Sequence, residues 1–183
     1  VNTGIYCFNT EWLWDNLKSL DSALGGEVLL TDLVEKAHEQ GFVIETQSVK
    51  DSNEAIGINT RVNLATAETV LQDRIRRRWM LAGVTMIDPD SVYIDAQVQH
   101  IGCDTVLHPN THVSGASIIG ERCQIGPNSV IDCSVLGEGC QISSSIVRDS
   151  TFEARVQVGP FAHVRSGSYL EEDVRIGSHA EVK

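Results

Sequence analysis

The sequence predicts a mixed architecture in three parts: the C-terminal end of an α/β domain, a long connector helix and a parallel β-helix. The β-helix is predicted by apolar residues that recur every six, and in places every five, positions from Ile101 to Val182. Small residues that follow many of these positions support the same fold. The α/β part is predicted by strand-like and helix-like segments that alternate over residues 3–81.

The six-residue spacing persists through the second half of the chain, apart from three steps of five residues that follow Ile131, Ile142 and Val147. Its apolar positions are Ile101, Leu107, Val113, Ile119, Ile125, Ile131, Leu136, Ile142, Val147, Phe152, Val158, Val164, Leu170, Ile176 and Val182. One apolar residue in six is too sparse for an amphipathic helix, but it suits a short strand followed by a corner. Three such units make one triangular coil, and coils stack through parallel ladders about 4.8 Å apart. These apolar side chains should therefore point inward.

A second pattern places small residues four positions after many of the apolar ones. They are Thr105, Thr111, Ser117, Cys123, Ser129, Cys140, Ala162, Ser168 and Ala180. A small side chain fits next to a tight corner of the coil. Ile146 and Val174 are larger residues that depart from this pattern.

The first part of the chain is expected to mix strands and helices. Strands are expected at residues 3–8 and 42–49, and a first helix after a cap at Asn9 or Thr10. A second helix should begin at Thr31 and end at Gly41. A long helix is expected over residues 60–81, and its predicted apolar positions are Val62, Leu64, Ala67, Val70, Leu71, Ile75 and Trp79.

Composition argues against two classes of partner. The formal charge is -11, from 14 Lys+Arg against 25 Asp+Glu, whereas a phosphate backbone requires clustered cations. No run approaches the roughly 18 consecutive apolar residues of a membrane helix. We therefore expect neither a nucleic-acid nor a membrane partner. The five cysteines form no CxxC pair, so we expect reduced thiols that act as small core residues in a cytoplasmic protein.

Three cations share one place in the repeat. Arg165 and Lys183 directly follow two inward positions that are three repeat units, or one full coil, apart. They should stack on one outer face, and Arg148 should extend the same column. Like charges placed opposite each other are destabilising, so the column predicts an anion site that binds phosphate. The alternative is a set of solvated cations balanced by nearby glutamates.

Several segments in chain order carry a resemblance to a known family. They are Val1–Ile5, Gly26–Asp32, Gly57–Arg61, Met80–Val84 and Gly159–Arg165. With an arginine-rich connector helix and the β-helix, they resemble the bifunctional bacterial N-acetylglucosamine-1-phosphate uridylyltransferase / glucosamine-1-phosphate N-acetyltransferase. The resemblance covers essentially the whole chain.

The resemblance implies a domain organisation and an activity. Residues 1–61 would end a nucleotidyltransferase domain, residues 62–83 would form the connector, and residues 84–183 would begin a left-handed β-helix acetyltransferase domain. The family is cytoplasmic and trimeric. It acetylates glucosamine 1-phosphate from acetyl-CoA and then transfers a uridylyl group from UTP. The product, UDP-N-acetylglucosamine, supplies peptidoglycan and lipopolysaccharide precursor synthesis.

The resemblance also implies residue roles. Asn2 and Thr31 match sugar-nucleotide contacts, and Asn59 matches an asparagine that coordinates Mg²⁺. Arg165 and Lys183 match two cations that bind the substrate phosphate at the acetyltransferase site. Two positions depart from the family pattern, Leu29 in place of a tyrosine and Ser166 in place of a proline.

No catalytic residue is expected in the chain. The family's glycine-rich loop and metal-binding aspartate would precede Val1, and its catalytic histidine would follow Lys183. We therefore expect an internal segment of a longer protein that is inactive alone.

Two other functions stay open at this point. One alternative is a single-function sugar-phosphate nucleotidyltransferase, in which the β-helix only regulates activity or promotes oligomerisation. A trimeric β-helix scaffold without enzymatic activity is the non-enzyme alternative.

Overall fold

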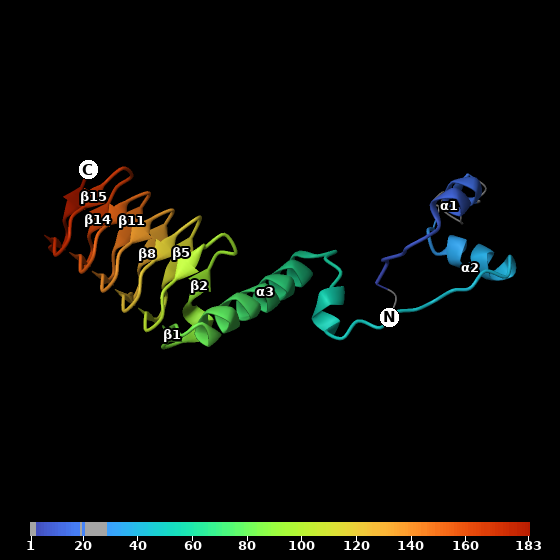
Figure 1. The fold of residues 1–183 in the computed structure, drawn as a ribbon, viewed down its shortest axis with the longest axis horizontal. Coiled ribbons are helices and arrows are strands. Elements are labelled where there is room, and N and C mark those ends of the chain that lie inside the picture. The colour runs from blue at the N-terminus through green and yellow to red at the C-terminus, as the bar shows by residue number, and fades with distance from the viewer. Residues whose placement is uncertain (1–2, 19, 21–28) are drawn as a thin grey trace. The chain divides into compact units, whose positions relative to one another are not determined.

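The structure is a computed structural model that describes residues 3–18, 20 and 29–183. It divides into two compact units, Val1–Leu64 and Ala65–Lys183. Figure 1 labels the elements along the chain. Among the described residues, no helix combines the length and the apolar character needed to span a bilayer.

The first unit contains short helices joined by extended segments. Its elements are α1 (Thr10–Leu17), α2 (Asp32–Glu39), the 3₁₀ helix η1 (Ser52–Ala55) and the start of α3 (Arg61–Leu81). Asn9 caps α1, as predicted, because its side-chain oxygen accepts a hydrogen bond from the backbone N–H of Trp12 at 3.1 Å. Gly41 follows α2 with a φ of 76°, a conformation that glycine adopts readily.

The expectation of two strands in this unit is wrong. Residues 3–8 and 42–49 are extended but belong to no strand in the described structure. A strand requires a neighbour that supplies its ladder hydrogen bonds, and no described segment does so here. The apolar side chains of Ile5 and Val43 are accordingly 81% and 87% exposed.

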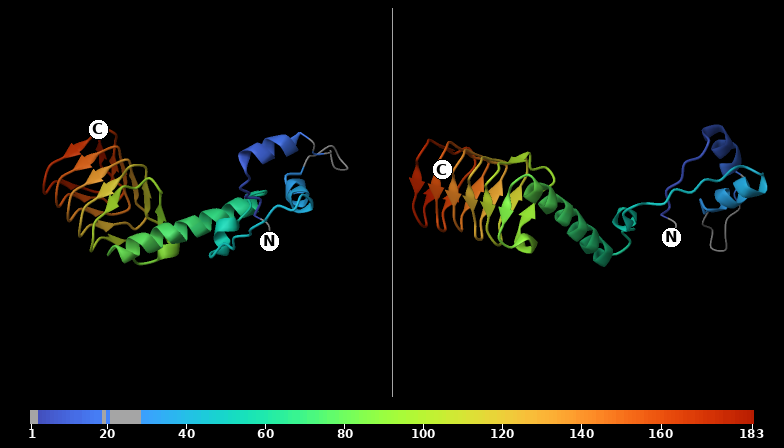
Figure 2. Two further views of the ribbon diagram at one scale, coloured as in Figure 1. Left: turned by 45° about the vertical axis from the view of Figure 1, so that its right-hand side comes forward. Right: turned by 60° about the horizontal axis from the view of Figure 1, so that its bottom comes forward.

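The second unit is a parallel β-helix, as the repeat predicted, and its coils stack along one axis (Figures 1 and 2). Sheet A contains β1 (Thr85–Met86), β4 (Val106–Leu107), β7 (Gln124–Ile125), β10 (Gln141–Ile142), β13 (Gln157–Val158) and β16 (Arg175–Ile176). Sheet B contains β2 (Tyr93–Ile94), β5 (His112–Ser114), β8 (Val130–Asp132), β11 (Ile146–Arg148), β14 (His163–Val164) and β17 (Glu181–Val182). Sheet C contains β3 (His100–Ile101), β6 (Ile118–Ile119), β9 (Val135–Leu136), β12 (Thr151–Phe152) and β15 (Tyr169–Leu170). A 3₁₀ turn, η2 (Pro89–Ser91), lies between β1 and β2.

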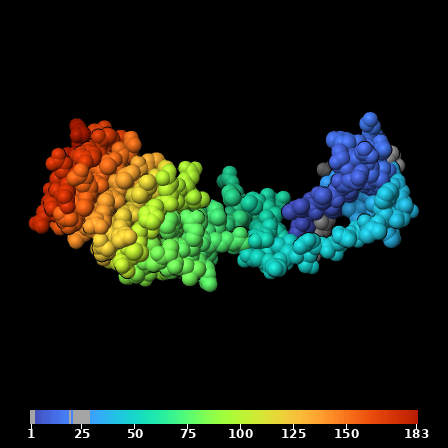
Figure 3. Space-filling model, viewed as in Figure 1, coloured from blue at the N-terminus to red at the C-terminus, as the bar shows by residue number. Residues whose placement is uncertain are grey.

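The predicted inward residues form the core of this unit. Leu107, Val113, Ile119, Ile125 and Ile131 are all fully buried. Each sheet stacks inward residues over inward residues, so the core is continuous from coil to coil. The space-filling view shows the coils packed against one another (Figure 3). This arrangement makes each coil depend on its neighbours for the burial of its apolar residues.

The five-residue steps in the repeat shorten the corners and leave the core in register. Ile131 pairs with Val147 after only 16 residues, and Val147 pairs with Val164 after 17. In these coils the buried small residue lies two positions before the next inward residue, as Ser145 does before Val147. Counting four positions forward was therefore wrong there. Ile146 is an outward strand residue and does not occupy the small position.

Helix α3 packs along the first coil, and half of the residues that it buries there are polar. Its buried residues are Gln72, Ile75, Arg76 and Trp79. The expectation that a broader apolar side of this helix is buried is wrong, because Val62 and Leu64 are 75% and 54% exposed. Only the last two predicted positions, Ile75 and Trp79, reach the β-helix core.

The polar residues that α3 buries satisfy the backbone of the first coil. The Gln72 side chain donates to the carbonyl of Ile94 at 3.1 Å and accepts from its N–H at 3.2 Å. Arg76 donates to the carbonyl of Val92 and forms ion pairs with Asp73 and Asp90. From sequence, the run Arg76–Arg78 is expected to form a solvated face or to pair with acidic residues of the preceding domain, and the burial of Arg76 shows that this is wrong for that residue. A buried guanidinium is tolerated because these carbonyls and carboxylates partner it.

Candidate phosphate-binding column

Sheet B places three cations in one column at the C-terminal end of the β-helix. Val147, Val164 and Val182 are paired in register on strands β11, β14 and β17. The residues that directly follow them are Arg148, Arg165 and Lys183, and all three are exposed. The backbone N–H of Arg165 donates to the carbonyl of Val182 at 3.0 Å. Neighbouring members of the column are thus one ladder step apart, about 4.8 Å, as the repeat spacing predicted.

The ladder positions that precede the three cations on sheet B are not basic. On sheet B, Arg148 pairs in register with Asp132, which in turn pairs with Ser114. The hydroxyl of Ser114 donates to the Asp132 carboxylate at 2.8 Å. The side chains on this outer face of sheet B are therefore polar and acidic at Ser114 and Asp132, and they are basic at the three positions that follow.

The cations of the column are weakly neutralised. Arg165 forms one ion pair, with Glu181 at 3.1 Å, and both side chains are about half exposed. Such a pair contributes about 0–1 kcal/mol, because water competes for both charges. Its weakness leaves Arg165 able to exchange the carboxylate for a bound anion.

Two histidines lie near the column, and their roles are not assigned by the sequence. His163 precedes the inward Val164 on β14 and pairs in register with Glu181. His179 stacks on Phe161 at 5.2 Å between ring centroids, and Phe161 is 63% exposed. The column is thus flanked by an imidazole on its own strand and by an exposed aromatic pair at the preceding corner.

The candidate residues of the first unit do not form a comparable group. Asn2 lies outside the described residues. Thr31 is the N-cap residue of α2, and its hydroxyl makes no capping hydrogen bond. Asn59 is exposed just before α3, where its backbone N–H donates to the Asn63 side chain at 3.4 Å.

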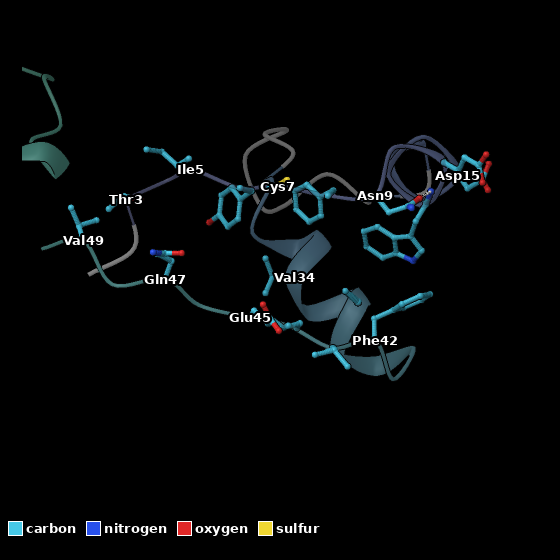
Figure 4. A pocket seen from close by; sticks show the side chains of 17 residues that line it. Thr3, Ile5, Cys7, Asn9, Asp15, Val34, Phe42, Glu45, Gln47 and Val49 are labelled. Atoms are coloured by element: carbon cyan, nitrogen blue, oxygen red, sulfur yellow. Dashed lines mark hydrogen bonds between the residues drawn. The ribbon is translucent and has the colours of Figure 1, made fainter.

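A cavity of about 1000 Å³ lies in the first unit, and neither Thr31 nor Asn59 is among its described lining residues. The lining comes from α1, α2 and the two extended segments (Figure 4). Aromatic contacts run through it from Tyr6 to Phe8, Trp12 and Phe42, with ring centroids 5.8–5.9 Å apart. The cavity is predominantly apolar.

The described residues hold no group of three or more His, Cys, Asp or Glu side chains that could bind a metal ion. Mg²⁺ prefers octahedral oxygen coordination and usually binds one or two carboxylates. Asn59 offers a single amide oxygen. The described part of the chain therefore does not make a complete magnesium site.

The cysteines follow the expected behaviour only in part. Cys123 and Cys140 are buried, but Cys7, Cys103 and Cys133 are exposed. The thiol of Cys123 donates to the carbonyl of Gly137 at 3.2 Å. A hydrogen bond with the Cys140 thiol, together with burial, raises the pKa of Cys123. The prediction that the cysteines pack in the core is thus confirmed for Cys123 and Cys140 and is wrong for the three exposed cysteines.

Comparison with known proteins agrees with the repeat. The family model described as bacterial transferase hexapeptide (six repeats) matches residues 100–133. The bifunctional protein GlmU of a Geobacillus species is 43% identical over 184 residues, which include the whole of this chain and 40% of the relative. The GlmU protein of Heliobacterium modesticaldum is 42% identical with the same coverage. The chain therefore spans about two fifths of the length of these relatives.

Among solved structures, a mutant of perosamine N-acetyltransferase from Caulobacter crescentus in complex with CoA and GDP-perosamine aligns with a TM-score of 0.48. It is 19% identical and covers 91% of this chain and 73% of that one. The curated relatives confirm the resemblance that the sequence segments indicated, along the entire chain.

Proposed function

We propose that this chain, a relative of the bifunctional GlmU proteins along its whole length, is a segment of an enzyme that makes UDP-N-acetylglucosamine. In this proposal the complete protein is a cytoplasmic homotrimer with a left-handed β-helix. It transfers an acetyl group from acetyl-CoA to glucosamine 1-phosphate and then a uridylyl group from UTP. Residues 1–61 would end the uridylyltransferase domain, residues 62–83 would connect, and residues 84–183 would begin the acetyltransferase domain.

The observation that carries this proposal is the stacking of Arg165 and Lys183 on sheet B. A guanidinium can donate two parallel hydrogen bonds to a phosphate, and an ammonium adds a compact charge. Both groups are exposed; Arg165 follows the buried Val164, and Lys183 follows Val182, which is partly buried and packs against the core. We assign them to the phosphate of glucosamine 1-phosphate.

The ion pair between Arg165 and Glu181 is part of this assignment. Glu181 occupies one of the guanidinium donors at 3.1 Å and would have to yield it, or share it, when the phosphate binds. Because this exposed pair is weak, a phosphate that engages both cations should displace it. Glu181 then keeps the guanidinium oriented along the column before substrate arrives.

In the first unit we assign only binding roles. Asn2 and Thr31 would contact the sugar nucleotide, and Asn59 would supply one oxygen ligand to Mg²⁺ at the uridylyltransferase site. The ion would neutralise phosphate charge there. The described residues contain neither a complete metal site nor an identified general base. We therefore expect this chain by itself to bind phosphosugar without turning it over.

The test is a calorimetric titration of the complete protein with glucosamine 1-phosphate. Arg165→Ala should weaken binding by about one to two orders of magnitude, because a charge-assisted hydrogen bond contributes roughly 1.5–3 kcal/mol. Arg165→Lys should recover only part of this affinity. Arg122→Ala removes an equally exposed arginine that bridges Glu121 and Glu138 on another corner, and it should leave the affinity unchanged.

Equal affinities for wild type and both Arg165 variants would remove the phosphate site. The β-helix would then have only a structural or regulatory role. A comparable loss in Arg122→Ala would show that net charge, and not the column, determines binding.

A further inference from the structure

Arg148 is the third cation of the column, and the proposed function does not use it. It stands one coil before Arg165, because Val147 pairs with Val164 in register. Its side chain is exposed on the same outer face of sheet B. A phosphate held by Arg165 and Lys183 leaves Arg148 at the edge of the site, within one further ladder step.

The charge of Arg148 is not neutralised by the acid closest to it in the ladder. Asp132 is its register partner, yet the two form no ion pair within the described structure, and the Asp132 carboxylate accepts from Ser114 instead. Arginines at corners of the same β-helix behave differently. Arg122 and Arg155 each bridge two carboxylates. Arg148 therefore forms no ion pair with a carboxylate of the described residues.

The position of Arg148 creates a repulsive contact that a ligand can relieve. Three like charges at successive ladder positions destabilise the strand pairing, and Glu181 neutralises only Arg165. An anion that extends along the column would contact all three cations. Their backbones span two ladder steps, about 9.6 Å, so two linked phosphates match this span better than one.

We propose that Arg148 makes the column a diphosphate site, in which one phosphate lies between Arg165 and Lys183 and the second lies between Arg148 and Arg165. The ligand class is a sugar or nucleoside linked to a diphosphate. This inference rests on the proposed phosphate site at Arg165. It adds that the product of the proposed enzyme, a nucleoside diphosphate sugar, competes with the sugar monophosphate for the same column.

The experiment titrates the full 183-residue chain with inorganic phosphate and with inorganic pyrophosphate in metal-free buffer. Wild type should bind pyrophosphate about tenfold more tightly than phosphate, because one further charge-assisted contact forms. Arg148→Ala should lose that preference and keep its phosphate affinity within about twofold. Arg148→Lys should restore part of the preference, since the charge remains but the bidentate fork does not. Arg122→Ala serves as the charge-matched control and should retain the wild-type preference.

The outcomes separate this inference from the function on which it rests. If Arg165→Ala weakens both ions while Arg148→Ala changes neither, the monophosphate site stands and the diphosphate inference is overturned. If Arg165→Ala changes neither ion, both fail. A pyrophosphate preference lost equally in Arg122→Ala also overturns the inference, because the preference would then reflect net charge.

Discussion

The closure of the first coil by α3 yields the most specific stability prediction. The Gln72 side chain forms both hydrogen bonds with the backbone of Ile94, at 3.1 and 3.2 Å. Strand β2 pairs with β5 on its other edge, so Gln72 occupies the place of a missing neighbouring strand. Gln72→Ala would leave two backbone groups without partners beside a fully buried side chain.

The expected loss follows from those two groups. A buried donor or acceptor without a partner costs about 1–3 kcal/mol, and water that enters the vacated space would offset part of this. We expect Gln72→Ala to lower the free energy of unfolding of the β-helix unit by about 2–4 kcal/mol. Urea unfolding followed by far-ultraviolet circular dichroism measures this change. Gln97→Ala, at an exposed position, should change it by less than about 0.5 kcal/mol.

A charge variant tests the same contact by its pH dependence. Gln72→Glu keeps an acceptor for the Ile94 N–H but loses the donor to its carbonyl. Burial should raise the pKa of the new carboxyl above about 4.3, its value in the unfolded chain. The folded state would then bind the proton more tightly, so stability relative to wild type should rise as pH falls toward that pKa. The reasoning is refuted if Gln72→Ala unfolds at the same urea concentration as wild type, or if the Gln72→Glu difference is independent of pH.

Two further predictions concern the core and a surface carboxylate. Ile125→Ala should cost about 2–5 kcal/mol of stability because the side chain is fully buried between coils. The control Ile87→Ala, at a 59% exposed position, should cost less than about 0.5 kcal/mol. Equal urea midpoints for the two variants would contradict the inward assignment of Ile125. A hydrogen bond from the Tyr169 hydroxyl lowers the pKa of Glu153. The stability that this bond supplies is therefore present above the ordinary carboxyl pKa and is lost as pH falls through the lowered folded pKa. Midpoints of wild type and Tyr169→Phe should differ at pH 7 and converge in acid, and a difference that persists below both pKa values would refute this linkage.

The sequence by itself determined the β-helix and the direction of its side chains. The period of six is a property of the backbone path, because every coil must return to the same corner before the next inward residue. That is why the burial of Ile125 and the stacking of Arg165 next to Lys183 followed from spacing alone. The shortened coils obeyed the same rule for inward residues, and only the count to the small position changed.

The tertiary structure decided features that depend on partners distant in sequence. Residues 3–8 and 42–49 have strand-like sequences, yet an extended segment becomes a strand only when a neighbour supplies hydrogen bonds. Gln72 and Arg76 resemble surface residues of a helix, and only the backbone groups of the first coil make their burial favourable. The engagement of Asp132 by Ser114, which leaves Arg148 without an acidic partner in the described structure, likewise depends on side-chain geometry between coils. Repeat spacing specifies which residues are neighbours, but the choice among possible polar partners is made by the three-dimensional packing.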